Sequence, residues 1–289
     1  MRVTVFGATG VIGQALLPLL IGEHDVAAVS RNPHEPADGM RWVRADAATG
    51  SGVAEAVDGA DIVYYLVHSL GTPDFARQDQ AAAANVAGCA APAGVKQIVY
   101  LGGLGGDEPS TSPHLRSRRE TGQRLAAEGV PVTTLRAAMV IGAGSAAFET
   151  IIGLVKRLPV MITPSWVSTP TQPIALADVA RYLAGVAGNP AAGGQTFDAG
   201  GPEVMTYRQM IERIAALLGR RPRIVEVPVL TPALSALWLE LVTPVNSAVA
   251  RPLVEGLRNP TIARDQRIRE LIPFDLTPFD DAARRALKR

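Results

Sequence analysis

Short apolar runs alternate with amphipathic stretches along the first half of the chain. The runs begin at Val3, Val26, Arg41, Asp61, Lys96 and Val132. Because they lack strict alternation, they are typical of parallel strands that are buried on both faces. The stretches between them carry apolar residues at helical spacing. This strand–helix order predicts an α/β fold with a Rossmann-type doubly wound parallel sheet, and we place that core at residues 1–140.

The pattern loosens after residue 140, where prolines break the chain into shorter pieces. Helices are predicted at 146–158, 178–187 and 207–218, short strands at 196–198 and 223–227, and helical structure with proline interruptions from 231 to 289. We expect residues 141–289 to form a small C-terminal α/β lobe for a substrate or a partner, with parts that return to the core.

The first strand leads directly into three glycines, Gly7, Gly10 and Gly13, and a helical pattern follows them. Gly7 permits a tight turn, Gly10 lets the backbone approach a pyrophosphate, and Gly13 allows close packing of the helix on the sheet. The first N–H groups of a helix lack internal partners and favour an anion. The structural alternative is a glycine turn without a ligand. In this context the motif predicts a dinucleotide site with contacts from Gly7, Thr9, Gly10, Val11, Ile12 and Gly13.

The end of the second strand bears on which dinucleotide binds. An acidic residue there accepts hydrogen bonds from both ribose hydroxyls of NAD, whereas an arginine pairs with a 2′-phosphate. This strand ends in Ser30 and Arg31, and no Asp or Glu follows until Glu35. We therefore favour NADP(H) over NAD(H); the alternative is an arginine that solvates the strand end or stacks on adenine. Asp46, which ends the third strand, is a candidate for binding the adenine amino group.

The strand predicted at 61–67 ends with Val67 and His68. Ligands of open α/β sheets lie beyond the carboxyl ends of the strands, so both residues are expected to border the cofactor. A histidine there is either an acid or base or, more commonly, a packing and hydrogen-bonding residue. We assign His68 to cofactor binding and leave a catalytic role open.

The amino-acid composition gives no indication of a nucleic-acid-binding, membrane-spanning or metal-cluster protein. The chain is 47% hydrophobic and 19% charged with a formal net charge of +1, which gives no bias toward nucleic acid or anionic lipid. The single cysteine, Cys89, forms neither an internal disulfide nor a metal cluster, so we expect no metal site. No apolar run reaches the roughly 20 residues that span a bilayer, and the first strand leaves no room for a signal peptide. We expect a cytoplasmic protein, either a monomer or a homodimer.

The chain resembles the short-chain dehydrogenase/reductase superfamily. It looks most like the atypical NAD(P)H-binding branch that includes NmrA-like regulators and the NADPH-bearing accessory subunit of respiratory complex I. The resemblance covers nearly the whole length and is strongest over residues 1–140. It is carried by the glycine motif and by Arg31-Asn-Pro33, Asn85, the loop Gly102-Gly-Leu-Gly-Gly106, Arg136 and Ile174-Ala-Leu-Ala-Asp178.

The resemblance also implies where catalysis would take place. Active members of the family carry a serine after the fifth strand and a Tyr-x-x-x-Lys pair on the next helix. Here a glycine, Gly102 or Gly103, stands at the serine, and His114 and Arg118 stand at the tyrosine and lysine. By this correspondence His114 would be the acid and Arg118 would bind the nicotinamide ribose; the start of a solvated helix is the alternative for His114.

A further match concerns the helix predicted at 74–93. Its Asn85 corresponds to the family's helix asparagine, which supports a proton-relay water. By this match Asn85 is a candidate catalytic residue, although the tyrosine and lysine that complete the family's relay are absent here.

Three functions remain open at this point. The first is an NADPH-dependent reductase or quinone-type oxidoreductase that lacks the usual Ser/Tyr/Lys set. The second is a redox sensor or accessory protein that binds NADP(H) without chemistry and signals through a partner. The third is an epimerase- or dehydratase-like enzyme, which the missing tyrosine makes the weakest of the three.

Overall fold

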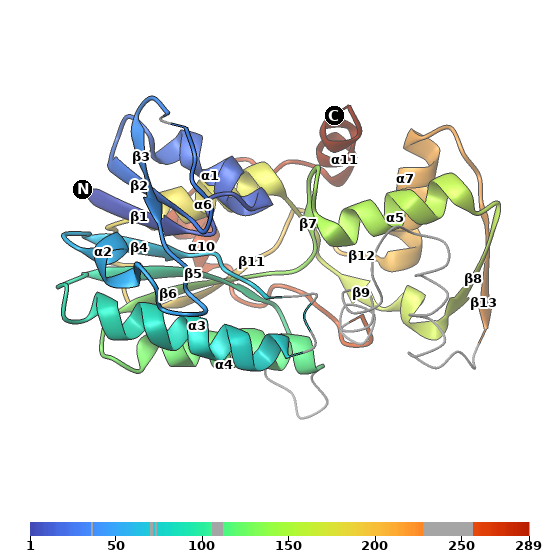
Figure 1. Ribbon diagram of the computed structural model, residues 1–289. Coiled ribbons are helices and arrows are strands. Elements are labelled where there is room, and N and C mark those ends of the chain that lie inside the picture. Colours follow the sequence, from blue (N-terminus) through green and yellow to red (C-terminus); the bar gives the residue numbers. More distant parts are fainter. Residues whose placement is uncertain (36, 70–71, 73, 106–111, 228–256, 289) are drawn as a thin grey trace.

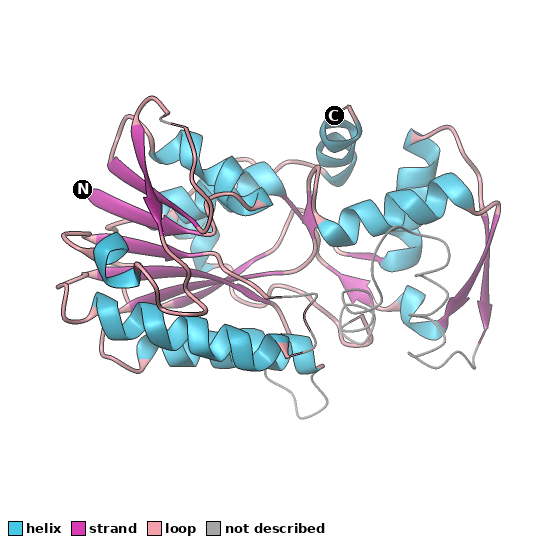
Figure 2. Cartoon of the chain, viewed as in Figure 1, coloured by secondary structure: helices cyan, strands magenta, loops and turns pink. Residues whose placement is uncertain are grey.

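A parallel sheet of seven strands lies at the centre of the protein (Figures 1 and 2). The computed structural model describes residues 1–35, 37–69, 72, 74–105, 112–227 and 257–288. The strands of the sheet, in chain order, are β1 (Arg2–Phe6), β2 (Asp25–Ser30), β3 (Met40–Arg44), β4 (Ile62–Tyr65), β5 (Gln97–Gly103), β6 (Val132–Ala137) and β11 (Thr196–Ala199). Their spatial order is β11-β6-β5-β4-β1-β2-β3, and every neighbouring pair is parallel. The order reverses between β1 and β4, which is the switch point where such sheets bind ligands.

Helices cover both faces of this sheet. One face carries α1 (Val11–Leu20), α6 (Leu176–Gly185) and the short α10 (Arg267–Leu271), and the other carries α2 (Val53–Val57), α3 (Phe75–Ala90) and α4 (Pro113–Ala126) (Figure 1). Because both faces are covered, the strand residues are buried on each side, as the continuous apolar runs predict. The predicted fold class is therefore confirmed.

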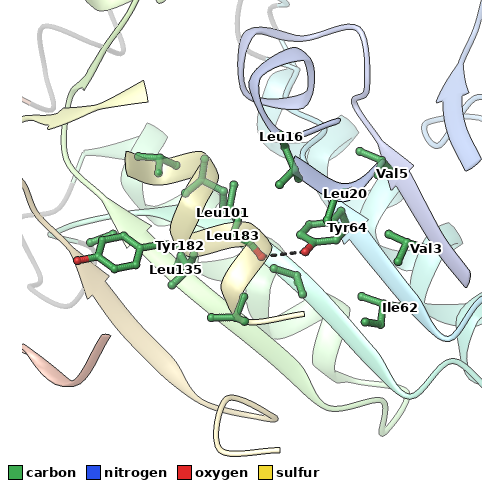
Figure 3. Close-up of a cluster of buried hydrophobic side chains, with 14 of the residues drawn as sticks. Val3, Val5, Leu16, Leu20, Ile62, Tyr64, Leu101, Leu135, Tyr182 and Leu183 are labelled. Atoms are coloured by element: carbon green, nitrogen blue, oxygen red, sulfur yellow. Dashed lines mark hydrogen bonds between the residues drawn. The ribbon is translucent and has the colours of Figure 1, made fainter. Parts of the chain in front are cut away.

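The core under α1 and α6 joins segments that are far apart in the sequence (Figure 3). Tyr64 of β4 is fully buried, and its hydroxyl donates a 2.8 Å hydrogen bond to the carbonyl of Leu183 in α6. Leu16 and Leu20 of α1 belong to the same cluster. Residues after 140 thus complete one face of the core.

The remaining elements form the C-terminal lobe. Its helices are α5 (Ala146–Arg157), the 3₁₀ turn η1 (Ser165–Ser168), α7 (Tyr207–Leu217) and α11 (Phe279–Leu287). Its paired strands are β8 (Val160–Pro164) with β13 (Arg223–Val227), β7 (Val140–Ile141) with β10 (Ile174–Ala175), and β9 (Pro170–Thr171) with β12 (Met205–Thr206). The lobe has its own apolar cluster, which includes Phe148, Tyr207, Met210 and Phe279. The domain boundary at residue 140 stays a prediction.

Two expectations for the C-terminal half can be compared with the structure. The strand expected at 196–198 is β11, which extends the central sheet beside β6 and so lies in the core. Of the helical structure expected from residue 231, α10 and α11 are present, and 228–256 lie outside the described residues. Within the described ranges, none of the helices has the length and hydrophobicity to span a bilayer.

Candidate functional site

The three glycines form a tight turn between β1 and α1. Gly7 has a φ of +85°, which favours glycine, and a Cβ there would lie 2.8 Å from the carbonyl carbon of Leu66. The N–H of Gly10 donates to the carbonyl oxygen of Gly7 (3.0 Å). A Cβ on Gly13 would collide with that same oxygen and would lie 2.7 Å from the Cα of Ala8. Gly7 and Gly13 are thus required by contacts within the protein.

Gly10 has a different environment. A Cβ there would meet only the Gly7 oxygen, at 3.2 Å, and the residue is exposed. Gly10 is also the N-cap of α1, and no side chain caps this helix end. The open side of Gly10 and the N–H groups of Val11 and Ile12 therefore form a cradle that fits a phosphate group.

The ends of β2 and β3 lie on one side of this cradle. Ser30 is buried, and its hydroxyl accepts a hydrogen bond from the N–H of Asn32 (3.2 Å) and lies 2.8 Å from Nε2 of His34. The His34 ring stacks on Trp42 with a centroid distance of 4.0 Å. Arg31 is exposed beside this group. Ser30 therefore occupies the position at which NAD-specific sites carry a carboxylate.

Two further polar residues lie at the same edge of the sheet. Arg44 pairs in register with Ser30 and is exposed, so it adds a second positive charge near Arg31. Asp46 follows β3, and its Oδ1 accepts from the N–H of Ala48 (2.9 Å). The carboxylate of Asp46 thus stabilises its own turn, and its contact with adenine stays a prediction.

The ends of β4 and the start of α4 lie on the other side of the cradle. His68 follows β4, and its Nδ1 lies 2.9 Å from Oδ2 of Asp79, which is 1% exposed. The N–H of Ser69 donates to the second oxygen of Asp79 (2.8 Å), and the hydroxyl of Ser117 lies 3.4 Å from Oδ2. Asp79 therefore receives three polar contacts that hold it in place beneath His68.

His114 lies next to His68 at the start of α4. The ring centroids are 5.1 Å apart. Nε2 of His68 and Nδ1 of His114 are both buried without a hydrogen-bond partner among the described residues. Buried polar atoms normally have partners, so these two unpaired nitrogens on neighbouring rings are candidates for contact with a ligand.

Arg118 lies one turn further along α4. Its Nη2 donates to the carbonyl oxygen of Leu101 in β5, and its guanidinium stacks over the ring of Tyr100 at 5.0 Å. Its Nη1 has no partner within the described part of the chain. The arginine is thus anchored on β5 with one nitrogen left for another contact.

The two histidines have lowered pKa values. Burial lowers the pKa of His68, and Arg118 lowers it further, while the hydrogen bond and charge of Asp79 act in the opposite direction. Burial, with the charges of His68 and Arg118, lowers the pKa of His114 to about 3. Burial alone would raise the pKa of Asp79, but the hydrogen bonds from His68 and Ser69 leave it below its usual value. Near neutral pH Asp79 is therefore an anion and both imidazoles are neutral.

The two positions taken from the family pattern have other surroundings. Asn85 lies six residues after Asp79 on α3, about 9 Å along the helix axis, and its amide donates to the carbonyls of Ala47 (2.8 Å) and Ala48 (3.3 Å). These bonds tie α3 to the loop after β3, and the structure does not bring Asn85 to the histidines; its relay role stays a prediction.

Gly103 is one of the two glycines that stand at the position of the family's serine. A Cβ on Gly103 would lie 2.9 Å from the Leu115 side chain, so α4 fills the space that a serine side chain would need there.

The structure thus brings most of the predicted residues to one edge of the sheet. The glycine turn, Ser30, Arg31, Asp46, Val67, His68, His114 and Arg118 all lie at or beyond the carboxyl ends of β1 to β5. Asp79 was missed by the sequence reasoning. The available signal was its position on the apolar face of α3, three residues before Ala82 and seven before Val86, because a carboxylate on a buried face requires a partner.

No group of three His, Cys, Asp or Glu side chains suited to a metal ion occurs among the residues that the structure describes. Cys89 is partly buried on α3, against the cluster under α2, α3 and α4.

Comparison with known proteins agrees with this reading of the site. The model of a family described as NAD(P)H-binding matches residues 7–190. A curated relative, the (4-alkanoyl-5-oxo-2,5-dihydrofuran-3-yl)methyl phosphate reductase of Streptomyces griseus, is 24% identical over 283 residues, which cover 96% of this chain and 95% of the relative.

Solved structures share the fold over its full length. A nucleoside-diphosphate-sugar epimerase from Staphylococcus aureus has a TM-score of 0.79 at 18% identity, with 98% of this chain and 100% of that chain covered. The NADPH-dependent quinone oxidoreductase of Escherichia coli, solved with NADPH, has a TM-score of 0.77 at 21% identity, with 98% of each chain covered.

Proposed function

Because the chain belongs to the NAD(P)H-binding family, we propose that it is an NADP(H)-dependent reductase of the atypical short-chain dehydrogenase/reductase type, acting on conjugated carbonyl compounds or quinones. The observation that carries the proposal is the glycine cradle with arginines on one side and two unpaired imidazole nitrogens on the other. A dinucleotide on this cradle would extend toward both groups, because the sheet order reverses there.

The preference for NADP(H) rests on the end of β2. Ser30 and Arg31 take the place of an acidic residue, and Arg44 lies in register with Ser30. Two guanidinium groups favour a 2′-phosphate, which each of them can bind through paired N–H groups. The cradle residues Gly7, Thr9, Gly10, Val11, Ile12 and Gly13 would hold the pyrophosphate.

The opposite end of the site supports reduction of a small organic acceptor. Val67 and His68 would border the nicotinamide, and Arg118 would bind its ribose through the unpaired Nη1. The cofactor supplies hydride, while the protein supplies orientation and a proton. The name of the Streptomyces relative describes reduction of a 5-oxo-2,5-dihydrofuran, in which the carbonyl is conjugated with a ring double bond. Quinones share this conjugation, so both belong in one substrate class.

The test is to measure NADPH and NADH binding by titration and then to follow oxidation of the reduced cofactor with a panel of quinones, unsaturated lactones and simple ketones. We expect tighter binding of NADPH and turnover with the conjugated acceptors. Tight NADPH binding without turnover of any acceptor would contradict the reductase and leave the second candidate.

The second candidate is a redox sensor or accessory protein that binds NADP(H) without chemistry. It is favoured by the absence of the family's Ser/Tyr/Lys set and by Leu115, which fills the serine's place at Gly103. A sensor must bind NADPH and NADP⁺ with different affinities, because a ligand shifts an equilibrium only through differential affinity. Equal affinities would exclude the sensor.

An epimerase, like the Staphylococcus aureus protein of the same fold, is the third candidate and needs the missing tyrosine.

A further inference from the structure

His68 has the geometry of an imidazole whose two nitrogens have separate tasks. Nδ1 bonds to Asp79, a buried carboxylate that Ser69 and Ser117 also contact. A carboxylate only accepts, so the Nδ1 of neutral His68 must carry the proton. Nε2 then has a free lone pair, and no described residue contacts it through a hydrogen bond.

His114 does not have this support. No carboxylate lies within hydrogen-bond distance of its ring in the described ranges, and its Nδ1 is unpaired. Its pKa of about 3 also keeps the ring neutral over the ordinary pH range. The charge of Asp79 favours the protonated form of both rings, but among the described residues only His68 also has a hydrogen bond to this carboxylate.

We propose that His68 is the proton-transfer group of this site, that Asp79 is its positioning residue, and that the pair takes the place of the family's missing tyrosine and lysine. The proposal rests on the proposed reductase function and names its acid. A hydrogen-bonded carboxylate fixes the tautomer and orientation of an imidazole and stabilises the imidazolium, which is how such pairs act in other enzymes.

The chemistry balances with the cofactor as the reductant. Hydride adds to the acceptor carbon, and the π electrons of the conjugated carbonyl move onto its oxygen. That oxygen takes the proton from Nε2–H of the His68 imidazolium, which becomes neutral and regains a proton from solvent between turnovers. The net reaction consumes one NADPH, one proton and one acceptor, and gives NADP⁺ and the reduced acceptor.

Charged groups on two elements, α3 and α4, set the protonation of His68. Asp79 on α3 favours the imidazolium, while Arg118 on α4 disfavours it. His114, also on α4, lies beside it as a neutral ring. Tyr65 on β4 and Tyr100 on β5 belong to the same buried group and are neutral, because burial raises the pKa of each phenol.

The first test needs no turnover. The chain has four histidines, so the imidazole ¹⁵N signals can be assigned from His→Gln variants at each position. We expect the neutral form of His68 to carry its proton on Nδ1, and we expect D79N to lower the pKa of His68. A neutral His68 protonated on Nε2, or a pKa unaffected by D79N, would overturn the assignment.

The second test uses kinetics. With the imidazolium as the acid, kcat of the wild type is constant at low pH and falls as the pH rises through the pKa of His68. H68Q should lower the low-pH kcat by about 10²- to 10⁴-fold at saturating NADPH and remove this fall. D79N should move the fall to lower pH. H24Q, the same change at the amino edge of the sheet before β2, should leave the profile unchanged.

The outcomes separate the two proposals. If no acceptor is turned over by wild-type protein that binds NADPH, the reductase proposal fails and the acid role of His68 fails with it. If the wild type turns over an acceptor and folded H68Q keeps both the rate and the pH profile, only the assignment of His68 is overturned.

Discussion

The three glycines of the turn are needed for different physical reasons. Gly7 and Gly13 are required by contacts within the protein, with Leu66 and Ala8 respectively, whereas Gly10 leaves open space on the side where the phosphate would bind. A substitution at Gly13 therefore affects the fold and the site together. A glycine elsewhere with open surroundings has neither constraint.

We expect G13A to destabilise the protein by about 1–3 kcal/mol, because its Cβ forces α1 away from the turn, and to weaken NADPH binding at least about tenfold since the cradle moves with α1. Thermal unfolding and cofactor titration measure the two effects. The control is G88A on α3, where a Cβ meets nothing within 4 Å. G88A should raise stability by about 0.5–1 kcal/mol through helix propensity. Equal behaviour of the two variants would contradict this account.

The charge at Arg31 gives a second prediction at this scale. R31D should weaken NADPH binding by about 2 kcal/mol more than NADH binding, because a charge-assisted pair with the 2′-phosphate is replaced by repulsion. Titration with both dinucleotides measures the ratio of affinities. R41D makes the same change near the start of β3, where the register pairs Arg41 with Ala27, and should leave the ratio unchanged. An unchanged ratio in R31D would instead make Arg31 a solvated strand end.

At the scale of the elements, the sequence predicts where helices and strands lie better than it predicts which distant strands pair. The glycine turn and most helices and strands were predicted within a few residues, because their signals lie inside short windows. The placement of β11 beside β6 was not predicted, since Thr196–Ala199 pairs with residues about 60 positions earlier. Asp79 was missed for a different reason, because its signal is a single carboxylate on the buried face of α3, 11 positions after its partner His68.

Helix α7 offers a test of how one lobe element is stabilised. Thr206 caps it by accepting from the N–H of Gln209 (3.2 Å), and the Gln209 side chain accepts from the N–H of Thr206 (2.7 Å). T206A should cost about 1 kcal/mol, because the cap is lost. Denaturant unfolding measures the difference. T206S keeps the hydroxyl and should remain close to the wild type; a loss as large as that of T206A would show that the methyl group matters instead.

At the scale of the whole molecule, the C-terminal chain joins the core to the lobe. Asp178 of α6 is buried and accepts hydrogen bonds from the N–H (2.7 Å) and hydroxyl (2.9 Å) of Thr277. Two residues later, Phe279 enters the lobe cluster and its N–H donates to Glu203. One short segment is thus held by both parts of the protein.

D178A should therefore lower stability by about 1–3 kcal/mol, since the part-buried N–H and hydroxyl of Thr277 lose their partner. It should also speed hydrogen exchange in α11 more than in the central sheet. Exchange measured by mass spectrometry distinguishes these regions. E128A removes only a surface ion pair with Arg124 at the end of α4 and should change neither quantity. Uniformly faster exchange in D178A would mean that α11 does not open as a separate unit.

The hydrogen bond between Tyr64 and Leu183 shows that one face of the core can close only late in synthesis. The two residues are 119 positions apart, and α6 and β11 complete the sheet only after the first lobe segments have been made. Until then a nascent chain exposes the apolar side of β4 and β5 and the unpaired edge of β6. Such long-range closure slows folding and leaves a surface open to aggregation. We expect a ribosome-bound chain that ends at residue 140 to bind a chaperone through this exposed surface. The full-length chain, which completes the sheet, should no longer bind the chaperone.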